Sequence, residues 1–149
     1  RYARAFVLEH LDRVDEAIAE LRAVAKRRPD DASALNALGY TLADHGRRLP
    51  EAERLIRAAL ERRPDSAAIQ DSLGWVLHRR GRSAEALAWL QRAYENEPDP
   101  EIAAHLGEVQ WALGDRAAAE RTWRAALEKA PGNRPVQEAL DRHLGKTGP

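Results

Sequence analysis

The sequence contains no cysteine and no methionine among its 149 residues, and only one phenylalanine. The lack of cysteine excludes disulfide bonds, thiol catalysis and thiolate metal sites, and it is compatible with an oxidising or a reducing compartment. Because translation starts with methionine, we expect a fragment or processed piece of a longer protein, from which targeting signals can have been cut away. An apolar content of 44% that leans on alanine favours many small contacts over one thick core.

The chain also lacks a net charge, because 24 Lys and Arg residues balance 24 Asp and Glu residues. Without a net positive field, electrostatic attraction to a polyphosphate or to an anionic bilayer is weak. We therefore expect no nucleic-acid partner. No apolar run approaches the roughly 20 residues of a membrane-spanning helix, and no signal peptide is present, so we expect no direct membrane insertion by this chain.

An internal repeat accounts for most of the sequence. The segments ALNALGYTLADHG (34–46), AIQDSLGWVLHRRG (68–81) and IAAHLGEVQWALGD (102–115) align with a Leu-Gly pair in register and a second glycine seven residues later. The segments that follow are EAERLIRAALERRP, EALAWLQRAYENEP and AAERTWRAALEKAP, with small, bulky and proline residues at matching places. The repeats start at residues 32, 67 and 100, a mean period of 34. A fixed period in this range indicates a stacked repeat architecture.

Glycine, proline and aspartate mark the packing and the ends of the predicted helices. The glycine of each Leu-Gly pair leaves no side chain on its face, so we expect it to lie against alanines of the second helix and to allow close approach. The second glycine predicts the end of the first helix. Pro50 and Pro100 suit a first helical turn, where the missing N–H costs nothing. The predicted N-caps are Asp31, Asp65, Asp99 and Asp115.

These patterns resemble the tetratricopeptide repeat (TPR), because several of its signature positions recur in three successive copies. The resemblance implies an all-α, right-handed α-solenoid of about four helix pairs plus a C-terminal capping helix, hence about nine helices and no β-strand. It implies no cofactor. The implied repeats are about 1–31, 32–66, 67–99 and 100–133, with the capping helix at about 134–146. Asp141 replaces the packing glycine there, so we expect the array to end at this helix.

A second, finer resemblance lies in the phrases NALGYTLAD, DSLGWVLHRRG and ALAWLQRAYENEPDPEIAAHLGEVQWALGD. They look like the C-terminal repeats of large proteobacterial TPR lipoproteins of the outer membrane, which include an adaptor of a periplasmic C-terminal processing protease. This resemblance implies a non-catalytic scaffold that brings the protease and its cell-wall hydrolase substrates together in the periplasm. The lipid-attachment cysteine of such a protein is absent from this piece. The location therefore rests on the resemblance alone, and a cytoplasmic location is expected if it fails.

The TPR resemblance also implies a concave groove for a protein or peptide partner. Certain positions of each first helix point into that groove. The residues at these positions are Asn36, Tyr40 and Asp44 in the second repeat, Asp71, Trp75, His78 and Arg79 in the third, and Glu108 and Trp111 in the fourth. The large amphipathic rings of Tyr40 and Trp75 favour contact with a partner. The alternative is that these rings fill the space between adjacent first helices.

Other candidate sites have weaker support. The five histidines lie on different predicted helices and no pair has the i, i+4 spacing of a two-histidine site, so we expect no metal site. Asp71, His78 and Glu108 have no accompanying nucleophile or glycine-rich phosphate loop, so we expect no catalytic centre. The arginine clusters KRRP, ERRP and HRRGR favour helix termination over ligand binding. Trp123 is expected in the core and Trp89 on an exposed flank.

Two classes of function remain open. A protein-interaction scaffold accounts for the repeats, the aromatic groove and the missing catalytic set. The alternative is a substrate-holding TPR array of an enzyme whose catalytic domain is not in this fragment. At the other end of the chain, Tyr2, Phe6, Glu9 and His10 would line a first repeat with no repeat before it, so we expect self-association through that end.

Overall fold

The computed structural model describes residues 13–145, which form eight α-helices and no β-strand. The helices are α2 Val14–Arg27, α3 Ala32–Asp44, α4 Leu49–Arg62, α5 Ala67–Arg79, α6 Ser83–Asn96, α7 Pro100–Ala112, α8 Arg116–Lys129 and α9 Arg134–Leu144. The predicted all-α solenoid is confirmed. The additional predicted helix, with Tyr2, Phe6, Glu9 and His10 and the expected self-association surface, lies outside the described residues.

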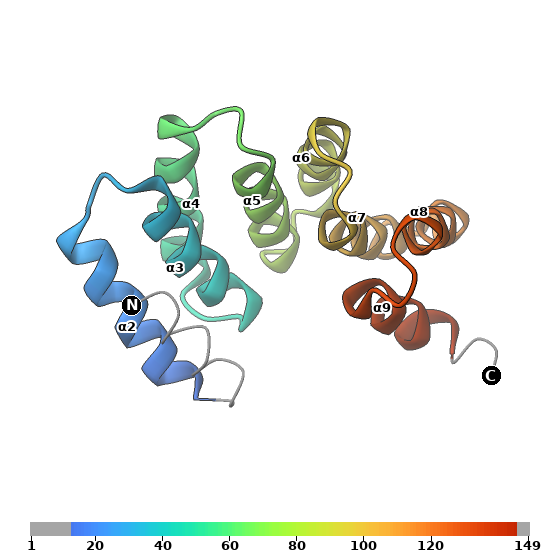
Figure 1. The fold of residues 1–149 in the computed structure, drawn as a ribbon, viewed down its shortest axis with the longest axis horizontal. Helices are drawn as coiled ribbons and strands as arrows, with labels where there is room; N and C mark the ends of the chain where they lie inside the picture. The colour runs from blue at the N-terminus through green and yellow to red at the C-terminus, as the bar shows by residue number, and fades with distance from the viewer. Residues whose placement is uncertain (1–12, 146–149) are drawn as a thin grey trace.

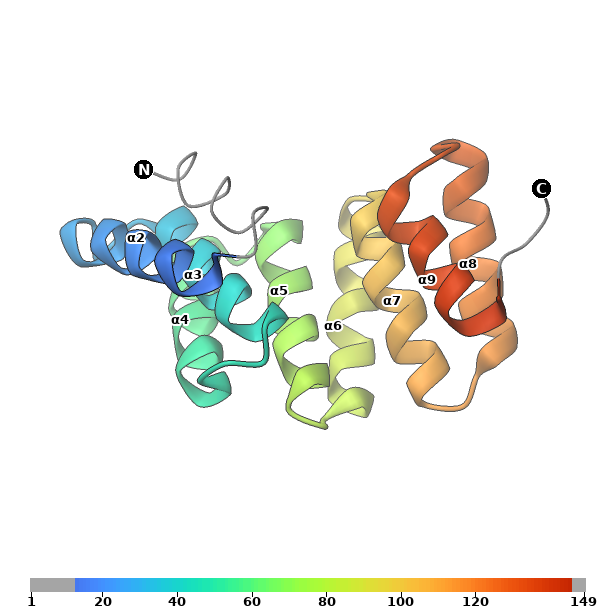
Figure 2. The ribbon, with the colours of Figure 1, turned by 90° about the horizontal axis from the view of Figure 1, so that it is seen from below.

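The helices pack as successive pairs along an arc (Figure 1). α3 pairs with α4, α5 with α6 and α7 with α8, while α2 packs on α3, and α9 packs on α7 and α8. Successive first helices also pack together, α3 with α5, α5 with α7 and α7 with α9, whereas the backbones of the described second helices α4, α6 and α8 stay farther apart. α4 and α6 meet only at side-chain level, for example in the 3.7 Å ion pair of Arg57 with Glu85. The first helices therefore converge on the inner side of the arc. In Figure 2, α3 lies in front of α4 and α9 in front of α8.

A glycine on each first helix receives a large side chain from the second helix. The pairs are Gly39 with Ile56, Gly74 with Leu90, and Gly107 with Trp123. A Cβ at Gly39 would lie 3.0 Å from the carbonyl oxygen of Ala52 but only 2.7 Å from Cγ1 of Ile56. An alanine therefore lies opposite this glycine, as expected, but it contributes backbone, and the prediction missed the bulky residue. That residue points at the first helix because the missing side chain leaves a hollow that only a larger group fills.

The two tryptophans of the second helices have different surroundings. Trp123 is fully buried, as expected, and its Nε1 donates a hydrogen bond to the Ala104 carbonyl at 3.2 Å. Trp89 is half-buried against the core instead of standing on an exposed flank. The Arg92 guanidinium lies 5.3 Å from the centre of its ring. The cation covers part of the indole, and the ring packs against the core cluster.

The helix ends follow the sequence pattern with one exception. Asp31, Asp99 and Asp115 accept backbone hydrogen bonds as N-caps, as predicted. At α5 the cap is Ser66, whose Oγ accepts from the Ile69 N–H at 3.2 Å, so the prediction of Asp65 is wrong. A cap must directly precede the first helical residue, and Asp65 stands one residue too far out. The glycines after α3, α5 and α7 have φ of 66°, 82° and 91°, a left-handed conformation that glycine adopts without strain.

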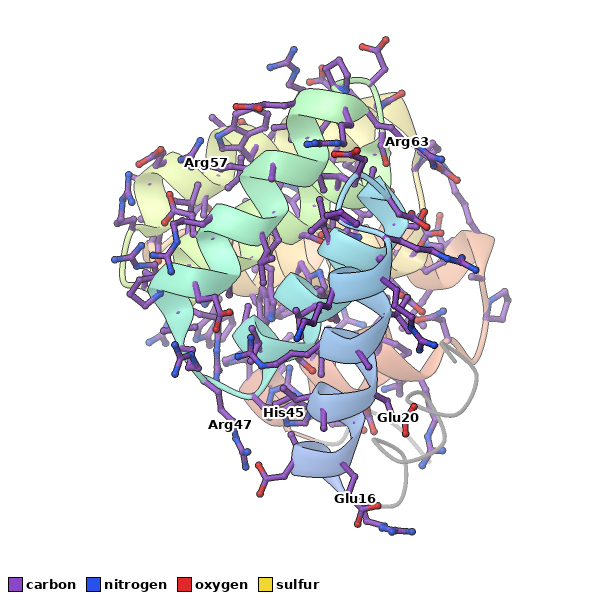
Figure 3. All side chains as sticks on the ribbon, turned by 90° about the vertical axis from the view of Figure 1, so that its left-hand side faces the viewer. Glu16, Glu20, His45, Arg47, Arg57 and Arg63 are labelled. Carbon is purple, nitrogen blue, oxygen red and sulfur yellow. The ribbon has the colours of Figure 1, made fainter. Side chains whose placement is uncertain are left out.

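Ion pairs join α2 to the following helix pair. Arg22 donates to both carboxylate oxygens of Glu51 on α4, at 2.6 and 2.7 Å, and Arg47 of the α3–α4 turn binds Asp15. Figure 3 shows Arg47 beside the first half of α2. The hydrogen bond from Arg22, with support from Arg48, lowers the pKa of Glu51 to about 2 against the opposing effect of burial.

The arginine cluster HRRGR also links repeats. Arg80 and Arg82 place guanidinium nitrogens 2.8 and 3.4 Å from the buried Glu53 on α4, and Arg57 donates to the same carboxylate at 2.8 Å. Burial alone would raise the pKa of Glu53, but the hydrogen bonds from Arg57 and Arg80 outweigh it and the pKa is lowered. The cluster therefore does more than end a helix, because it ties the end of α5 to the preceding repeat.

We predict that Gly107→Ala destabilises the array. In an ordinary helix this change adds roughly 0.5–1 kcal/mol of stability, but here the new Cβ overlaps the buried Trp123 indole. Overpacking of this kind typically costs about 1–3 kcal/mol, so we expect a net loss in urea unfolding. In a Trp123→Ala background the clash is relieved, and there Gly107→Ala should be neutral or stabilising. An equal loss in both backgrounds would contradict this explanation.

Candidate functional site on the inner face

Four rings from three first helices meet on the inner side of the arc. The rings of Trp75 on α5 and His105 on α7 are stacked, with centroids 4.2 Å apart and an interplanar angle of 22°. Tyr40 on α3 places its Oη 3.3 Å from Nε2 of His105, and the His78 ring lies 5.3 Å from the Trp75 ring. Because α3 and α7 belong to repeats that are not adjacent, their side chains can meet only where the first helices converge. We call Tyr40, Trp75, His78 and His105 the ring cluster.

Two aspartates hold the ring cluster in place. Oδ1 of the buried Asp71 lies 2.8 Å from Nδ1 of His105. A carboxylate can only accept, so Nδ1 of His105 carries the hydrogen of this bond. Asp44, at the end of α3, accepts a hydrogen bond from Nε1 of Trp75 at 3.1 Å. The polar edge of the Trp75 indole is therefore used inside the array, and what it can offer a partner is apolar ring surface.

The two histidines beside Trp75 have pKa values that are shifted in opposite directions. Burial lowers the pKa of His105, but the charge and hydrogen bond of Asp71, with Asp44 and Glu101, raise it, and the net pKa is raised. At His78 burial lowers the pKa and outweighs the carboxylate of Glu108, so the net pKa is lowered. The ring cluster therefore favours a cation at His105 and a neutral ring at His78.

A second group of rings joins the capping helix α9 to α7. Glu108 accepts from Arg142 and from Nε2 of His143, the latter at 2.8 Å. The His143 ring lies 4.7 Å from Trp111 and stacks on Trp123 at 5.5 Å. Glu108 and Trp111 were predicted as groove residues for a partner. Here they also anchor the last helix.

The structure brings some of the predicted groove residues together and separates others. Tyr40, Asp71, Trp75 and His78 belong to one cluster, while Glu108 and Trp111 belong to the α7–α9 joint. The exposed Arg79 directs Nε to the Ala43 carbonyl at the end of α3, 3.1 Å away.

Asn36 is half-buried on α3, and its Oδ1 is buried without a hydrogen bond. The rings fill space between first helices, as the alternative interpretation expected, yet Tyr40, Trp75, His78 and Trp111 each keep part of their surface exposed. Partner binding at these positions stays a prediction.

His105 is the residue that the sequence analysis missed. In the sequence, His105 was considered only as one of five histidines on different predicted helices, and its position is not among those expected to face the groove. A signal was nevertheless present, because His105 follows Asp71 by 34 residues and His143 follows Glu108 by 35. A histidine one repeat after an acid, where the acid precedes a tryptophan by one helical turn, is a pattern that could have indicated both joints.

The described residues offer little to other chemistries. Residues 13–145 contain no group of three or more His, Asp or Glu side chains placed to hold a metal ion. Within the same range, no helix has the length and apolar character needed to cross a bilayer. What the inner face presents chemically is ring surface and hydrogen-bonding groups.

Comparison with known proteins identifies the repeat. Residues 2–53 and 46–101 match one tetratricopeptide repeat model, and residues 100–125 match another. The chain belongs to the tetratricopeptide repeat family. It is 43% identical over 107 residues to a TPR repeat-containing protein of Pseudomonas aeruginosa, a region that is 72% of this chain and 18% of that protein. The TPR chain therefore spans less than a fifth of the length of this relative.

Solved TPR structures share the fold. A thermophilic TPR protein of Thermus thermophilus superposes with a TM-score of 0.82 at 24% identity, covering 96% of this chain and 79% of that one. An O-GlcNAc transferase mutant of Thermobaculum terrenum superposes with a TM-score of 0.74 at 24% identity, covering 86% of this chain and 25% of that one. At these identities the similarity establishes the TPR solenoid and carries no information on partners.

We predict that Asp71→Asn destabilises the array more at pH 6 than at pH 8.5. The folded-state pKa of His105 is raised, so the stabilisation from its charged form is complete below the usual value of about 6.5 and is lost as pH rises through the folded-state pKa. A hydrogen bond to a charged group is worth about 1.5–3 kcal/mol, which sets the expected loss at pH 6.

Thermal unfolding at the two pH values measures this difference. Glu120→Gln is the matched control, because it removes an exposed ion pair with Arg124 that should be worth about 0–1 kcal/mol at either pH. An equal loss for Asp71→Asn at both pH values would show that charge on His105 does not contribute.

Proposed function

We propose that this TPR array is a non-catalytic interaction scaffold whose inner groove captures a protein or peptide segment. The observation that carries the proposal is the row of partly exposed rings, Tyr40 on α3, Trp75 on α5 and Trp111 on α7, along successive first helices. Such rings combine a large apolar area with little conformational freedom, which is the chemistry of interface anchors. Family membership supports the same function, because TPR arrays generally bind proteins or peptides.

The polar contacts divide into two groups in this proposal. Asp71 and Glu108 are already engaged by histidines of neighbouring helices, so they position the rings instead of contacting the partner. Of the predicted polar residues, the half-buried Asn36 and the exposed Arg79 are the ones that these histidines do not engage, and they would fix the register of a bound segment. Apolar side chains of the partner would lie against the exposed parts of the rings.

We propose further that the longer protein acts on the periplasmic side of the outer membrane. There it would be a lipoprotein adaptor that presents cell-wall hydrolases to a C-terminal processing protease. The support is the resemblance of the segments 36–44, 71–81 and 86–115 to the repeats of such lipoproteins. Most of that activity would belong to regions outside this chain, which spans 18% of the Pseudomonas aeruginosa relative.

A substrate-holding array of an enzyme is the second candidate. The observation that favours it is the similarity to the Thermobaculum terrenum O-GlcNAc transferase, of which this chain covers 25%. The complete reading frame separates the two candidates. A lipid-attachment cysteine followed by further repeats supports the adaptor, and a catalytic domain supports the enzyme.

We predict that Trp75→Ala in the full-length protein weakens binding to the purified C-terminal processing protease or its hydrolase substrate by about 30-fold or more. That factor corresponds to the roughly 2 kcal/mol of a central aromatic anchor. Titration calorimetry measures it. Arg92→Ala and Glu128→Ala, on the exposed outer faces of α6 and α8, should change affinity by less than about threefold.

Stability must be controlled because Trp75 also packs inside the array. Trp75→Phe keeps an aromatic ring but loses the Nε1 hydrogen bond to Asp44, so it separates the loss of anchor surface from the loss of packing. Melting temperatures of all variants are compared by circular dichroism. If Trp75→Ala keeps its melting temperature and binds as the wild type does, the groove is not the binding site.

A further inference from the structure

The two inner-face joints share one arrangement of an acid, a tryptophan and a histidine. The acid and the tryptophan lie one turn apart on a first helix, and the histidine comes from the next first helix. The histidine contacts the acid through a ring nitrogen and lays its ring against the tryptophan. The members are Asp71, Trp75 and His105 at the α5–α7 joint, and Glu108, Trp111 and His143 at the α7–α9 joint.

His105 differs from His143 in reach and in burial. Its second nitrogen, Nε2, lies 3.3 Å from Oη of Tyr40 on α3, so this one side chain of α7 is in contact with both preceding first helices, α3 and α5. Its side chain is 14% exposed, against 23% for His143. His105 is therefore the group through which Tyr40 and Trp75, from different repeats, are held relative to each other.

We propose that His105 is a positioning residue of the groove, which fixes the Tyr40 ring relative to the Trp75 ring and holds the two more firmly when it is protonated. The link to partner capture rests on the proposed function. The positioning itself is a property of the array alone, and it can be measured without a partner.

The number of N–H donors on the imidazole explains why protonation of His105 would hold the two rings more firmly. In neutral His105 the single N–H is at Nδ1, facing Asp71, so Nε2 can only accept from the Tyr40 hydroxyl. In the cation both nitrogens donate, and the bond to Tyr40 reverses direction. Charge-assisted bonds are shorter and roughly twice as strong as neutral ones. Protonation therefore tightens both links of His105 at once.

The charges around His105 come from all three helices. Asp44 on α3, Asp71 on α5 and Glu101 on α7 favour the cation, whereas His78 on α5 disfavours it if it is charged. Burial keeps the pKa of His78 low, so this opposition is weak near neutral pH. The raised pKa of His105 places its titration above the usual histidine value of about 6.5. Rings that are held before binding lose less freedom on binding, so affinity should fall as pH rises.

Nuclear magnetic resonance of the indole N–H signals tests the positioning directly. The chain has four tryptophans, and Trp75→Phe identifies the signal of Trp75 by its disappearance. We expect the Trp75 signal to shift between pH 5.5 and 9 with a midpoint above about 6.5. His105→Gln, which keeps hydrogen-bonding capacity without a titrating charge, should abolish that shift, and Asp71→Asn should move its midpoint to lower pH.

Two controls separate His105 from the other histidines. His78→Gln removes the second ring beside Trp75, and His143→Gln removes the equivalent histidine of the α7–α9 joint. Both should leave the Trp75 midpoint in place. The proposal is overturned if the Trp75 signal still titrates in His105→Gln, or if it loses its titration in His78→Gln. Should His105→Gln unfold, Asp71→Asn decides, because an unchanged midpoint in that variant also overturns the proposal.

A second arm tests the link to binding. Calorimetry of the wild type with the purified protease should show affinity about three- to tenfold weaker at pH 8.5 than at pH 6, and His105→Gln should lose this difference. A Trp75 titration without any binding to the protease leaves the positioning intact and counts against the proposed function. Binding that depends on Trp75 but not on pH overturns the coupling and leaves the proposed function standing.

Discussion

The close contact between a glycine on one helix and a large side chain on the next is the interaction on which the array depends. Trp123 and Leu90 are fully buried only because Gly107 and Gly74 leave hollows on the facing helices. This contact brings the two helices of a repeat close together, and the surrounding alanines fill the remaining space with little side-chain entropy to lose. No single pair encloses a core, so each pair is stabilised mainly by its neighbours.

The stacking of helix pairs on their neighbours curves the array, and this curvature creates the inner face. The backbones of successive first helices pack together while those of α4, α6 and α8 stay farther apart, and the array therefore bends toward the first helices. The bend brings Tyr40 and His105 together although they are 65 residues apart. An inner-face cluster of this kind depends on the geometry of several joints at once, so a change at one joint is felt by side chains two repeats away.

The sequence predicted the features that repeat locally and failed on those that depend on curvature. Helix order, the glycines that end the first helices and the burial of Trp123 follow from residue type and register, and they were predicted. The Ser66 cap was missed because Asp and Ser both suit an N-cap and the two are adjacent in the sequence. His105 was missed for a different reason: register assigns a residue to one face of its own helix, whereas its contact with Tyr40 is determined by the angle between three helices.

In the proposed scaffold, the rings of the inner face would both pack within the array and bind a partner, so the two interactions would be coupled energetically. Trp75 and Tyr40 pack against His105 within the array, and the same rings present the surface that a partner would contact. Any interaction that orders the rings, whether a partner segment or a proton on His105, lowers the cost of the other by the same amount, because coupling between two binding events is reciprocal. A partner that prefers the ordered rings would therefore raise the proton affinity of His105, and capture from neutral solution would be accompanied by proton uptake. The size of that uptake follows from how far the free-state pKa of His105 lies below that of the complex, so a groove in which His105 is already fully charged would bind without it.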